Sequence, residues 1–102
     1  MGDQALATAA DILYIMQNNR ILGEYMIGRT SNVEHRRLEL GKCMNFEMVV
    51  LATFPLWGHL ETEIKRALEP RRVKMGTRRE WFKCSLSEML HTVGITFSLS
   101  RS

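Results

Sequence analysis

Two short apolar runs joined by a polar turn, with a capped helix directly behind them, constrain the fold of this chain more than any other stretch. Residues 12–16 (ILYIM) and 22–28 (LGEYMIG) have the length and the apolar and aromatic content of β-strands. Residues 17–20 between them include two asparagines, which tolerate the left-handed backbone that hairpin turns require. The sequence therefore predicts a β-hairpin over residues 12–28.

A helix is predicted immediately after this hairpin. Ser31 and Glu34 have the spacing of a capping box, in which the two side chains satisfy free N–H groups at the start of a helix. We therefore expect a helix over residues 32–43, with Arg36 and Arg37 on either side of its apolar stripe. The side chains expected to form that stripe are Val33, Leu40 and Met44.

Two further elements are predicted in the middle of the chain. Residues 46–54 (FEMVVLATF) are apolar on both alternating faces, which is typical of a strand in the middle of a sheet. Residues 57–68 (WGHLETEIKRAL) have the apolar period of a helix, and Pro70 follows where that helix should end. Its buried stripe is predicted to consist of Leu60, Ile64, Ala67 and Leu68.

The last third is predicted to be a basic hairpin or loop, followed by a short helix. Residues 71–83 (RRVKMGTRREWFK) carry the basic charge and should turn at residues 76–77. A second capping box at Ser85 opens a helix that should end near Val93. The side chains expected to anchor the hairpin in the core, rather than to stack on bases, are Trp81 and Phe82.

The order of these elements is β-β-α-β-α, followed by the basic hairpin and the short helix. It predicts an α+β domain over residues 11–97, with a small three-stranded, mainly antiparallel sheet flanked by helices. Residues 1–10 and 98–102 are expected to be flexible ends.

Composition restricts the environment and the partner. No apolar run approaches the roughly 20 residues that span a bilayer, so no membrane partner is expected. The net charge of +3 allows an anionic partner such as DNA. Cys43 and Cys84 lie far apart outside any CxxC motif, so we expect free, buried thiols in a reducing intracellular compartment, cytoplasmic or nuclear. The three histidines are scattered, which argues against a structural zinc site.

The residue pattern alone offers a few candidates for chemistry. Tyr14 lies on a predicted core strand, where its hydroxyl needs a partner. Arg36 and Arg37 flank the apolar stripe of the first helix, so at least one of them should lie near the sheet. Glu61 and Glu63 flank the stripe of the second helix, where an unpaired carboxylate is costly. A tyrosine, an arginine and a carboxylate that converge could activate water and hold a phosphate, but the pattern does not choose within either pair.

Several short motifs follow one another in a fixed order between residues 11 and 93. They are Tyr14, YMIGRT at 25–30, Asn32, Arg36, Glu39-Leu40, Leu60-Glu61 and EWF at 80–82. In order and spacing they resemble the GIY-YIG nuclease superfamily, and most closely its compact phage-type DNA-binding branch. The resemblance implies a GIY-YIG-like fold, DNA as partner, and metal-dependent hydrolysis of backbone phosphodiester bonds.

The resemblance also implies a role for each matching residue. Tyr14 would orient or deprotonate the attacking water, and Arg36 would stabilise charge on the scissile phosphate. Glu61 would hold a divalent metal, Mg²⁺ or Mn²⁺. Gly28 would let the phosphate approach the backbone. These assignments choose one arginine and one glutamate from the two pairs that the pattern left open.

Four positions depart from the family pattern. Ile12 and Leu13 replace the glycine and the middle residue of the first triplet, and Met26 occupies the tyrosine position of the second. Tyr25 is adjacent but should point to the opposite face of its strand. Lys65 stands where this branch usually has a histidine. The departures leave two functions open: an endonuclease of reduced activity, or a DNA-binding module on the same fold that does not cleave.

Further side chains are expected to assist at this site. Arginine greatly outnumbers lysine in the chain, and its guanidinium suits bidentate phosphate contacts. His59 lies close before the metal-binding glutamate and is a candidate for proton transfer. A protein-interaction domain is disfavoured, because the tyrosine, arginine and glutamate are all present. The arginines expected to contact phosphate, unless they only decorate a solvated surface, are Arg29, Arg37, Arg71, Arg72, Arg78 and Arg79.

Overall fold

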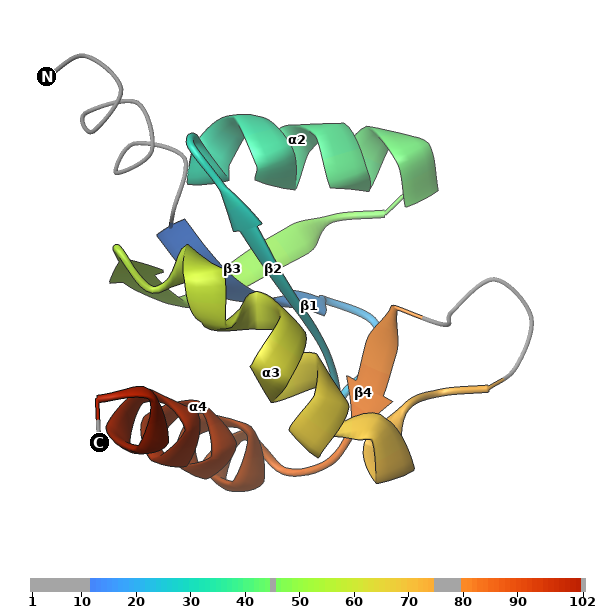
Figure 1. Cartoon of the computed structure of the whole chain (residues 1–102). Helices are drawn as coiled ribbons and strands as arrows, with labels where there is room; N and C mark the ends of the chain where they lie inside the picture. Colours follow the sequence, from blue (N-terminus) through green and yellow to red (C-terminus); the bar gives the residue numbers. More distant parts are fainter. Residues whose placement is uncertain (1–11, 45, 75–79, 102) are drawn as a thin grey trace, which may run out of the picture.

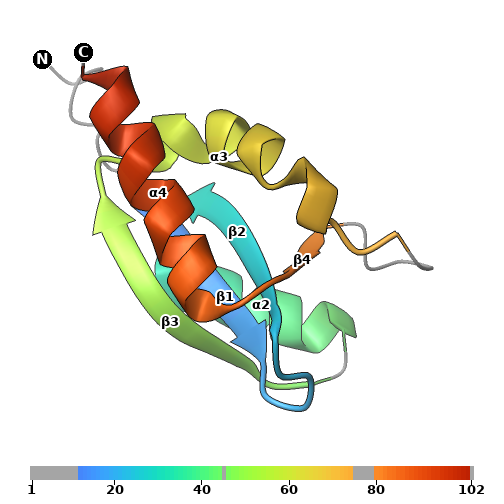
Figure 2. The ribbon, with the colours of Figure 1, turned by 90° about the horizontal axis from the view of Figure 1, so that it is seen from below.

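The computed structural model of the 102-residue chain describes residues 12–44, 46–74 and 80–101. A four-stranded antiparallel sheet separates α2 on one face from α3 and α4 on the other (Figure 1). Seen from below, α4 crosses the sheet and α3 lies to one side of it (Figure 2). The elements are β1 (Ile12–Asn18), β2 (Glu24–Thr30), α2 (Val33–Met44), β3 (Met48–Pro55), η1 (Gly58–Leu60), α3 (Glu61–Ala67), η2 (Glu69–Arg71), β4 (Trp81–Lys83) and α4 (Leu86–Ser100).

The α+β class is confirmed, but the prediction of three strands is wrong. The fourth strand is β4, which pairs antiparallel with the first part of β2, from Glu24 to Met26. The strand order is β3-β1-β2-β4. The sequence predicted this segment as the return limb of a separate basic hairpin, because three residues carry no alternating pattern long enough to mark a sheet strand.

The strand in the centre of the sheet is β1, and the prediction that residues 46–54 would lie there is wrong. β1 is buried on both faces, with Leu13 and Ile15 toward α3 and α4, and Tyr14 and Met16 toward α2. Among the described strands, β3 pairs only with β1 and forms an edge, with every second residue exposed. The apolar sequence of β3 therefore reflects a half-covered strand.

Two hydrophobic cores hold the layers together, one on each face of the sheet. Trp81 and Phe82 are confirmed as core anchors, and as neighbours on β4 they enter opposite cores. Of the predicted stripe on residues 57–68, Leu60, Ile64 and Leu68 are buried. Ala67 is exposed, so that part of the prediction is wrong.

The first hairpin forms where the sequence predicted it, with shifted strand ends. The Asn18 side chain accepts a hydrogen bond from the Arg20 backbone N–H at 2.8 Å, and the Asn18 carbonyl accepts one from Ile21 at 3.2 Å. Gly23 adopts a left-handed backbone with φ of 84°, which glycine tolerates at little cost. β2 therefore starts at Glu24, two residues later than expected.

The helix caps are confirmed in one case and differ in the other. Ser85 caps α4 as predicted, because its hydroxyl accepts a hydrogen bond from the Glu88 backbone N–H at 3.0 Å. For α2 the capping side chain is Asn32, which accepts from the His35 backbone N–H at 3.0 Å. The prediction of Ser31 as the cap is therefore wrong by one residue.

The last helix continues beyond its predicted end. It was expected to stop near Val93, and α4 instead runs to Ser100. Its final turns are held by stacking of Phe97 on Trp57, with ring centroids 3.9 Å apart, and of Trp57 on Phe54 at 5.1 Å. A long-range aromatic contact of this kind leaves no local mark in the sequence of the helix.

The two described ends of the predicted basic hairpin lie side by side. Arg72 forms an isolated antiparallel bridge with Phe82, and the Val73 N–H donates to the Trp81 carbonyl at 2.8 Å. The expected turn at residues 76–77 and the side chains of Arg78 and Arg79 lie outside the described residues, as do residues 1–10.

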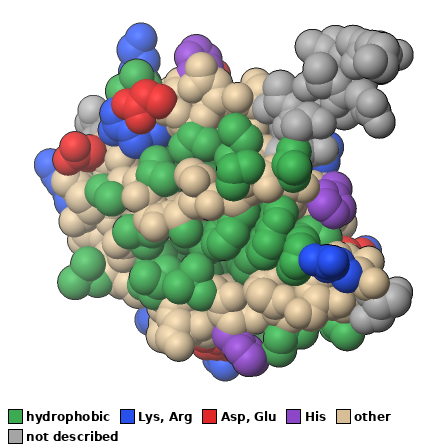
Figure 3. Space-filling model, turned by 90° about the vertical axis from the view of Figure 1, so that its left-hand side faces the viewer, with side chains coloured by type: hydrophobic (Ala, Val, Ile, Leu, Met, Phe, Trp, Pro, Cys, Tyr) green, Lys and Arg blue, Asp and Glu red, His purple; other side chains and the backbone are tan. Residues whose placement is uncertain are grey.

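The side of the molecule at the left of Figure 1, where β3 and α4 end, gathers hydrophobic side chains on its surface (Figure 3). α4 has no charged residue between Glu88 and Arg101. Its exposed large hydrophobic residues are Leu90, Ile95 and Leu99. This face therefore offers few cationic groups to a polyanion.

No helix in the described part of the chain has the length and apolar character needed to cross a membrane.

Both cysteines are free thiols, as predicted, but only one of them is partly buried. Cys43 is exposed on α2, so the expectation of burial is wrong for it, whereas Cys84 is half-buried beside α4. Burial, followed by the charge of Glu88, raises the pKa of the Cys84 thiol despite the opposing effect of Arg71.

We expect Cys43 to react with an aromatic disulfide reagent in a fast phase and Cys84 in a slow one, because reactivity follows thiolate content and access. Absorbance of the released thiolate at pH 8 measures both phases. Cys43→Ser should remove the fast phase and Cys84→Ser the slow one. A fast phase that survives Cys43→Ser would contradict this assignment.

Candidate functional site

Tyr14, Gly28 and Arg36 meet on the α2 face of the sheet. Tyr14 and Gly28 are directly opposite each other in the ladder between β1 and β2. The Tyr14 ring lies over the glycine, because a Cβ at position 28 would stand 2.5 Å from the ring carbon Cζ and closer still to the hydroxyl. Arg36 Nε donates a hydrogen bond to the Tyr14 hydroxyl at 3.4 Å. Two paired strands and the helix that follows them thus bring one residue each to this point.

Arg36 is held in place from a second side as well. Its Nη1 donates to Glu39 at 2.7 Å, one helical turn further along α2. The hydrogen bond from Arg36 to Tyr14, and then the one to Glu39, raise the pKa of Arg36 above its ordinary value. The sequence motif contained Glu39 but gave it no role, although its spacing of three residues from Arg36 predicts such a contact.

Arg37 is used differently from its neighbour. Its Nε donates to Glu34 at 2.9 Å, and its Nη1 donates to the Met48 carbonyl at 3.4 Å, which ties α2 to β3. The geometry therefore places Arg36, and not Arg37, beside Tyr14. This agrees with the choice that the family resemblance made and that the residue pattern left open.

Glu61 begins α3 and reaches the same end of β2 from the opposite face. Leu56, with a left-handed φ of 72°, turns the chain sharply out of β3 and into η1. A non-glycine residue in this conformation costs about 1–2 kcal/mol. Glu61 Oε1 then lies 3.9 Å from Arg29 Nε, and its Oε2 lies 3.0 Å from Lys65 Nζ.

Arg29 connects the two halves of the site. It follows Gly28 on β2, and because side chains alternate along a strand, Gly28 faces Tyr14 while Arg29 faces α3. β4 pairs with β2 only as far as Met26, so among the described strands none pairs with the outer edge of residues 27–30. The tyrosine–arginine pair and the glutamate thus flank the same end of β2, where its outer edge pairs with no described strand.

Basic surface leads away from Glu61. A hollow of about 410 Å³ is lined by Glu61, Thr62, Lys65, Arg66, Glu69 and Arg72. A second hollow of about 360 Å³ is lined by Glu24, Pro70, Arg71, Arg72, Val73, Lys74 and Lys83. The two share Arg72, so cationic side chains continue from the glutamate to the basic segment. Arg71 and Arg72 are already paired, with Glu88 at 2.9 Å and Glu69 at 3.0 Å.

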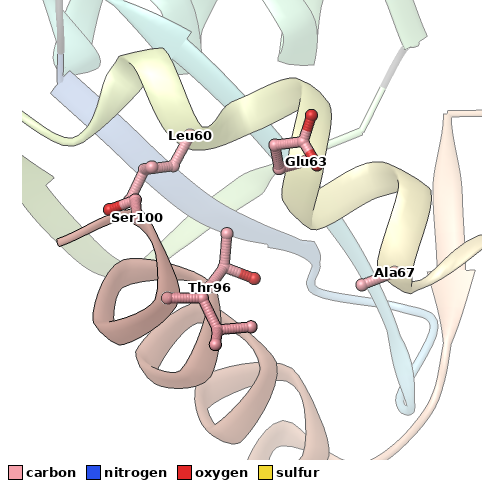
Figure 4. Close-up of a pocket in the computed structure, with 6 residues that line it drawn as sticks. Leu60, Glu63, Ala67, Thr96 and Ser100 are labelled. Atoms are coloured by element: carbon pink, nitrogen blue, oxygen red, sulfur yellow. The ribbon is translucent and has the colours of Figure 1, made fainter. Parts of the chain in front are cut away.

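Glu63 lies apart from this site. Its carboxylate pairs with Arg66 at 2.8 Å. It borders a groove of about 380 Å³ between α3 and α4, which Figure 4 shows together with Leu60, Thr96 and Ala67. That groove is mainly apolar. The structure therefore separates the two glutamates that the residue pattern could not distinguish.

The auxiliary candidates fall in different places. Met26 is buried in the same core as Tyr14 and Trp81, whereas Tyr25 is in the opposite core, as predicted from the alternation. His59 is exposed on η1, just before α3. Lys65 is bound to Glu61; burial lowers its pKa, but its hydrogen bonds and charge interactions with Glu61 and Glu80 outweigh that and raise it.

The carboxylates offer limited metal ligation. In the part of the chain that the structure describes, no group of three or more His, Cys, Asp or Glu residues could hold a metal ion. A single carboxylate such as that of Glu61 is sufficient for Mg²⁺, which keeps several of its waters and is commonly bound through one or two carboxylates and substrate phosphates. The donor set therefore fits a largely hydrated ion, provided that Lys65 gives way.

The fold and the site define a small α+β domain in which a tyrosine–arginine pair and a glutamate flank one end of a central hairpin, next to basic surface. A family model described as the T5orf172 domain matches residues 11–96, and the chain belongs to this family. The family is phage-associated, related to nuclease-type folds, and compatible with a nuclease or DNA-binding role. No significant match was found among curated proteins or among solved structures.

Proposed function

We propose that this domain is a GIY-YIG-type endonuclease that hydrolyses DNA backbone phosphodiester bonds with Mg²⁺ or Mn²⁺. The observation that carries the proposal is the hydrogen bond from Arg36 to the Tyr14 hydroxyl, directly over Gly28. This hydrogen bond joins a hydroxyl that can orient a water molecule to a cation that can bind a phosphate. Membership in the T5orf172 family and a net charge of +3 are compatible with DNA as the substrate.

The chain's own residues can divide the chemistry as follows. Arg36 donates to the oxygen of Tyr14, so the hydroxyl proton points elsewhere and can orient a water molecule. The water oxygen, oriented by Tyr14, bonds to phosphorus while the bond to the leaving oxygen breaks, and the proton that the water loses passes through solvent to the leaving oxygen. A guanidinium has five N–H donors, so Arg36 keeps donors for the phosphate oxygens after binding Tyr14 and Glu39.

Glu61 is the residue proposed to hold the metal ion. When bound, the ion would supply Lewis-acid stabilisation of charge on the phosphate. Arg29 orients the carboxylate from β2, and the basic hollows from Glu61 to Lys83 are proposed to follow the DNA backbone. Arg37, a member of the proposed phosphate-binding set, is held by Glu34 and by the Met48 carbonyl of β3, so it has little freedom to take part.

Nicking of supercoiled plasmid tests this function. We expect wild-type protein to nick DNA with Mg²⁺ or Mn²⁺, and Glu61→Gln to lower the rate by about 100-fold or more, as removal of a charge-stabilising group does in other enzymes. Glu63→Gln is the matched control, because it makes the same change on the same helix, outside the site. Undiminished nicking by Glu61→Gln would exclude Glu61 from the active site.

A DNA-binding module that does not cleave is the second candidate. The observation that favours it is Met26, a buried methionine at the position where the resemblance implies a second tyrosine. A gel shift that weakens steeply with salt, without nicking in either metal, would support this function, because phosphate contacts are salt-dependent. Absence of a shift at low salt would leave the protein-interaction interpretation.

A further inference from the structure

Lys65 lies between two carboxylates that come from different parts of the chain. Its Nζ is 3.0 Å from Glu61 Oε2 and 3.2 Å from Glu80 Oε2. Glu61 is one helical turn earlier on α3, and Glu80 stands directly before β4. The side chains of Lys65 and Glu61 are 23% and 24% exposed, whereas that of Glu80 is 62% exposed. The ammonium group thus forms ion pairs with both carboxylates, and the Glu61 carboxylate is the one less exposed to solvent.

Both oxygens of Glu61 already face cations. Oε2 is bound by Lys65, and Oε1 lies 3.9 Å from Arg29. Within this group of four, two positive charges balance the two negative charges of Glu61 and Glu80. A divalent ion that approached Glu61 would meet an ammonium group at hydrogen-bonding distance from the carboxylate, and like charges at that separation repel strongly where solvent is partly excluded. A metal ion and the Lys65 ammonium group therefore cannot bind the Glu61 carboxylate at the same time.

We infer that Lys65 is a positioning residue that gates metal binding: it fills the cation position on Glu61, and a metal ion enters only when the ammonium transfers to Glu80. This inference rests on the proposed role of Glu61 as metal ligand. Glu80 makes the transfer possible, because Lys65 keeps one of its two ionic partners when it releases the other. The resident lysine holds the metal affinity of the free domain low.

Manganese binding by the purified full chain, followed by the loss of the free Mn²⁺ paramagnetic resonance signal, tests the gate without DNA. We expect Lys65→Met to raise Mn²⁺ affinity at least tenfold over the wild type. Adding Glu61→Gln to Lys65→Met should cancel that gain. Lys42→Met, on the last turn of α2, is the matched control and should leave the affinity unchanged.

Glu80 gives a second, directional test. Glu80→Gln removes the place to which Lys65 transfers, so it should lower Mn²⁺ affinity several-fold in the wild type and have no effect in the Lys65→Met protein. Circular dichroism verifies the fold of each variant, and Lys65→Gln replaces Lys65→Met if the latter is unfolded. An affinity unchanged by loss of the ammonium, a gain that survives Glu61→Gln, or a Glu80→Gln effect that persists without Lys65 would each overturn the gate.

The result is separable from that of the proposed function. Tighter Mn²⁺ binding by Lys65→Met together with no nicking by any variant would keep the gate and remove the endonuclease. Nicking that depends on Glu61, with Mn²⁺ affinity unchanged by Lys65→Met, would keep the endonuclease and remove the gate.

Discussion

Gly28→Ala is expected to destabilise the domain by about 1–3 kcal/mol, the usual cost of forcing extra atoms into a packed core. The new methyl group would stand 2.5 Å from Tyr14 Cζ, so either the ring or the ladder between β1 and β2 must shift. Urea unfolding followed by circular dichroism measures the change. Displacement of the ring would also break the hydrogen bond from Arg36, so DNA cleavage should fall together with stability.

Gly94→Ala is the matched control for this substitution. Gly94 lies inside α4, and a Cβ there would meet nothing within 4 Å. Because glycine is unfavourable in a helix, this variant should be more stable by about 0.5–1 kcal/mol. In a Tyr14→Ala background the cost of Gly28→Ala should largely vanish, since the two residues are in contact. An equal cost with and without the Tyr14 ring would contradict the packing described here.

The parts of the fold that the sequence predicted are those with a local cause. The polar turn after β1, the capping serine of α4 and the apolar period of α3 each act over a few residues, and each is present in the structure. The alternation of side chains also placed Tyr25 and Met26 on opposite faces of β2. Such features depend on the backbone of one element and need no knowledge of its neighbours.

The order of the strands could not be predicted in the same way. Residues 46–54 are as apolar as a central strand, and nothing within them says that β3 pairs on one side only. β4 has three residues and is recognisable as a strand only through its pairing with Glu24–Met26. The end of α4 likewise depends on Trp57, which belongs to a different part of the chain. Each of these errors concerns a long-range contact.

The candidate site divides along the same line. Tyr14, Gly28 and Arg36 belong to a hairpin and the helix that follows it, so their meeting is a consequence of nearly contiguous sequence. The approach of Glu61 to Arg29 requires the position of α3 against β2, which only the tertiary structure supplies. The contact between Lys65 and Glu80 is of this second kind as well. The resemblance chose Glu61 over Glu63, but it could not show that a lysine occupies that carboxylate.

Arg36→Ala is expected to lower plasmid nicking by about 100- to 1,000-fold, the loss seen when one preorganised donor to a developing charge is removed. Two contacts end with it, the one that holds the Tyr14 hydroxyl at 3.4 Å and the one to Glu39 at 2.7 Å. Arg36→Lys should recover little of the rate, because a single ammonium group cannot reproduce the planar fork that binds the tyrosine, the glutamate and a phosphate together. Initial rates with Mg²⁺ and with Mn²⁺ measure the effect.

Arg37→Ala is the control, with the same residue type on the next position of the same helix. Its contacts are to Glu34 and to the Met48 carbonyl, so its loss should loosen the attachment of α2 to β3 and change the nicking rate only a few-fold. Comparable losses in both variants would mean that the rate responds to the charge of α2 as a whole. A loss confined to Arg36→Ala would instead assign the chemistry to the one guanidinium that reaches the tyrosine, because the two variants differ in that contact and not in net charge.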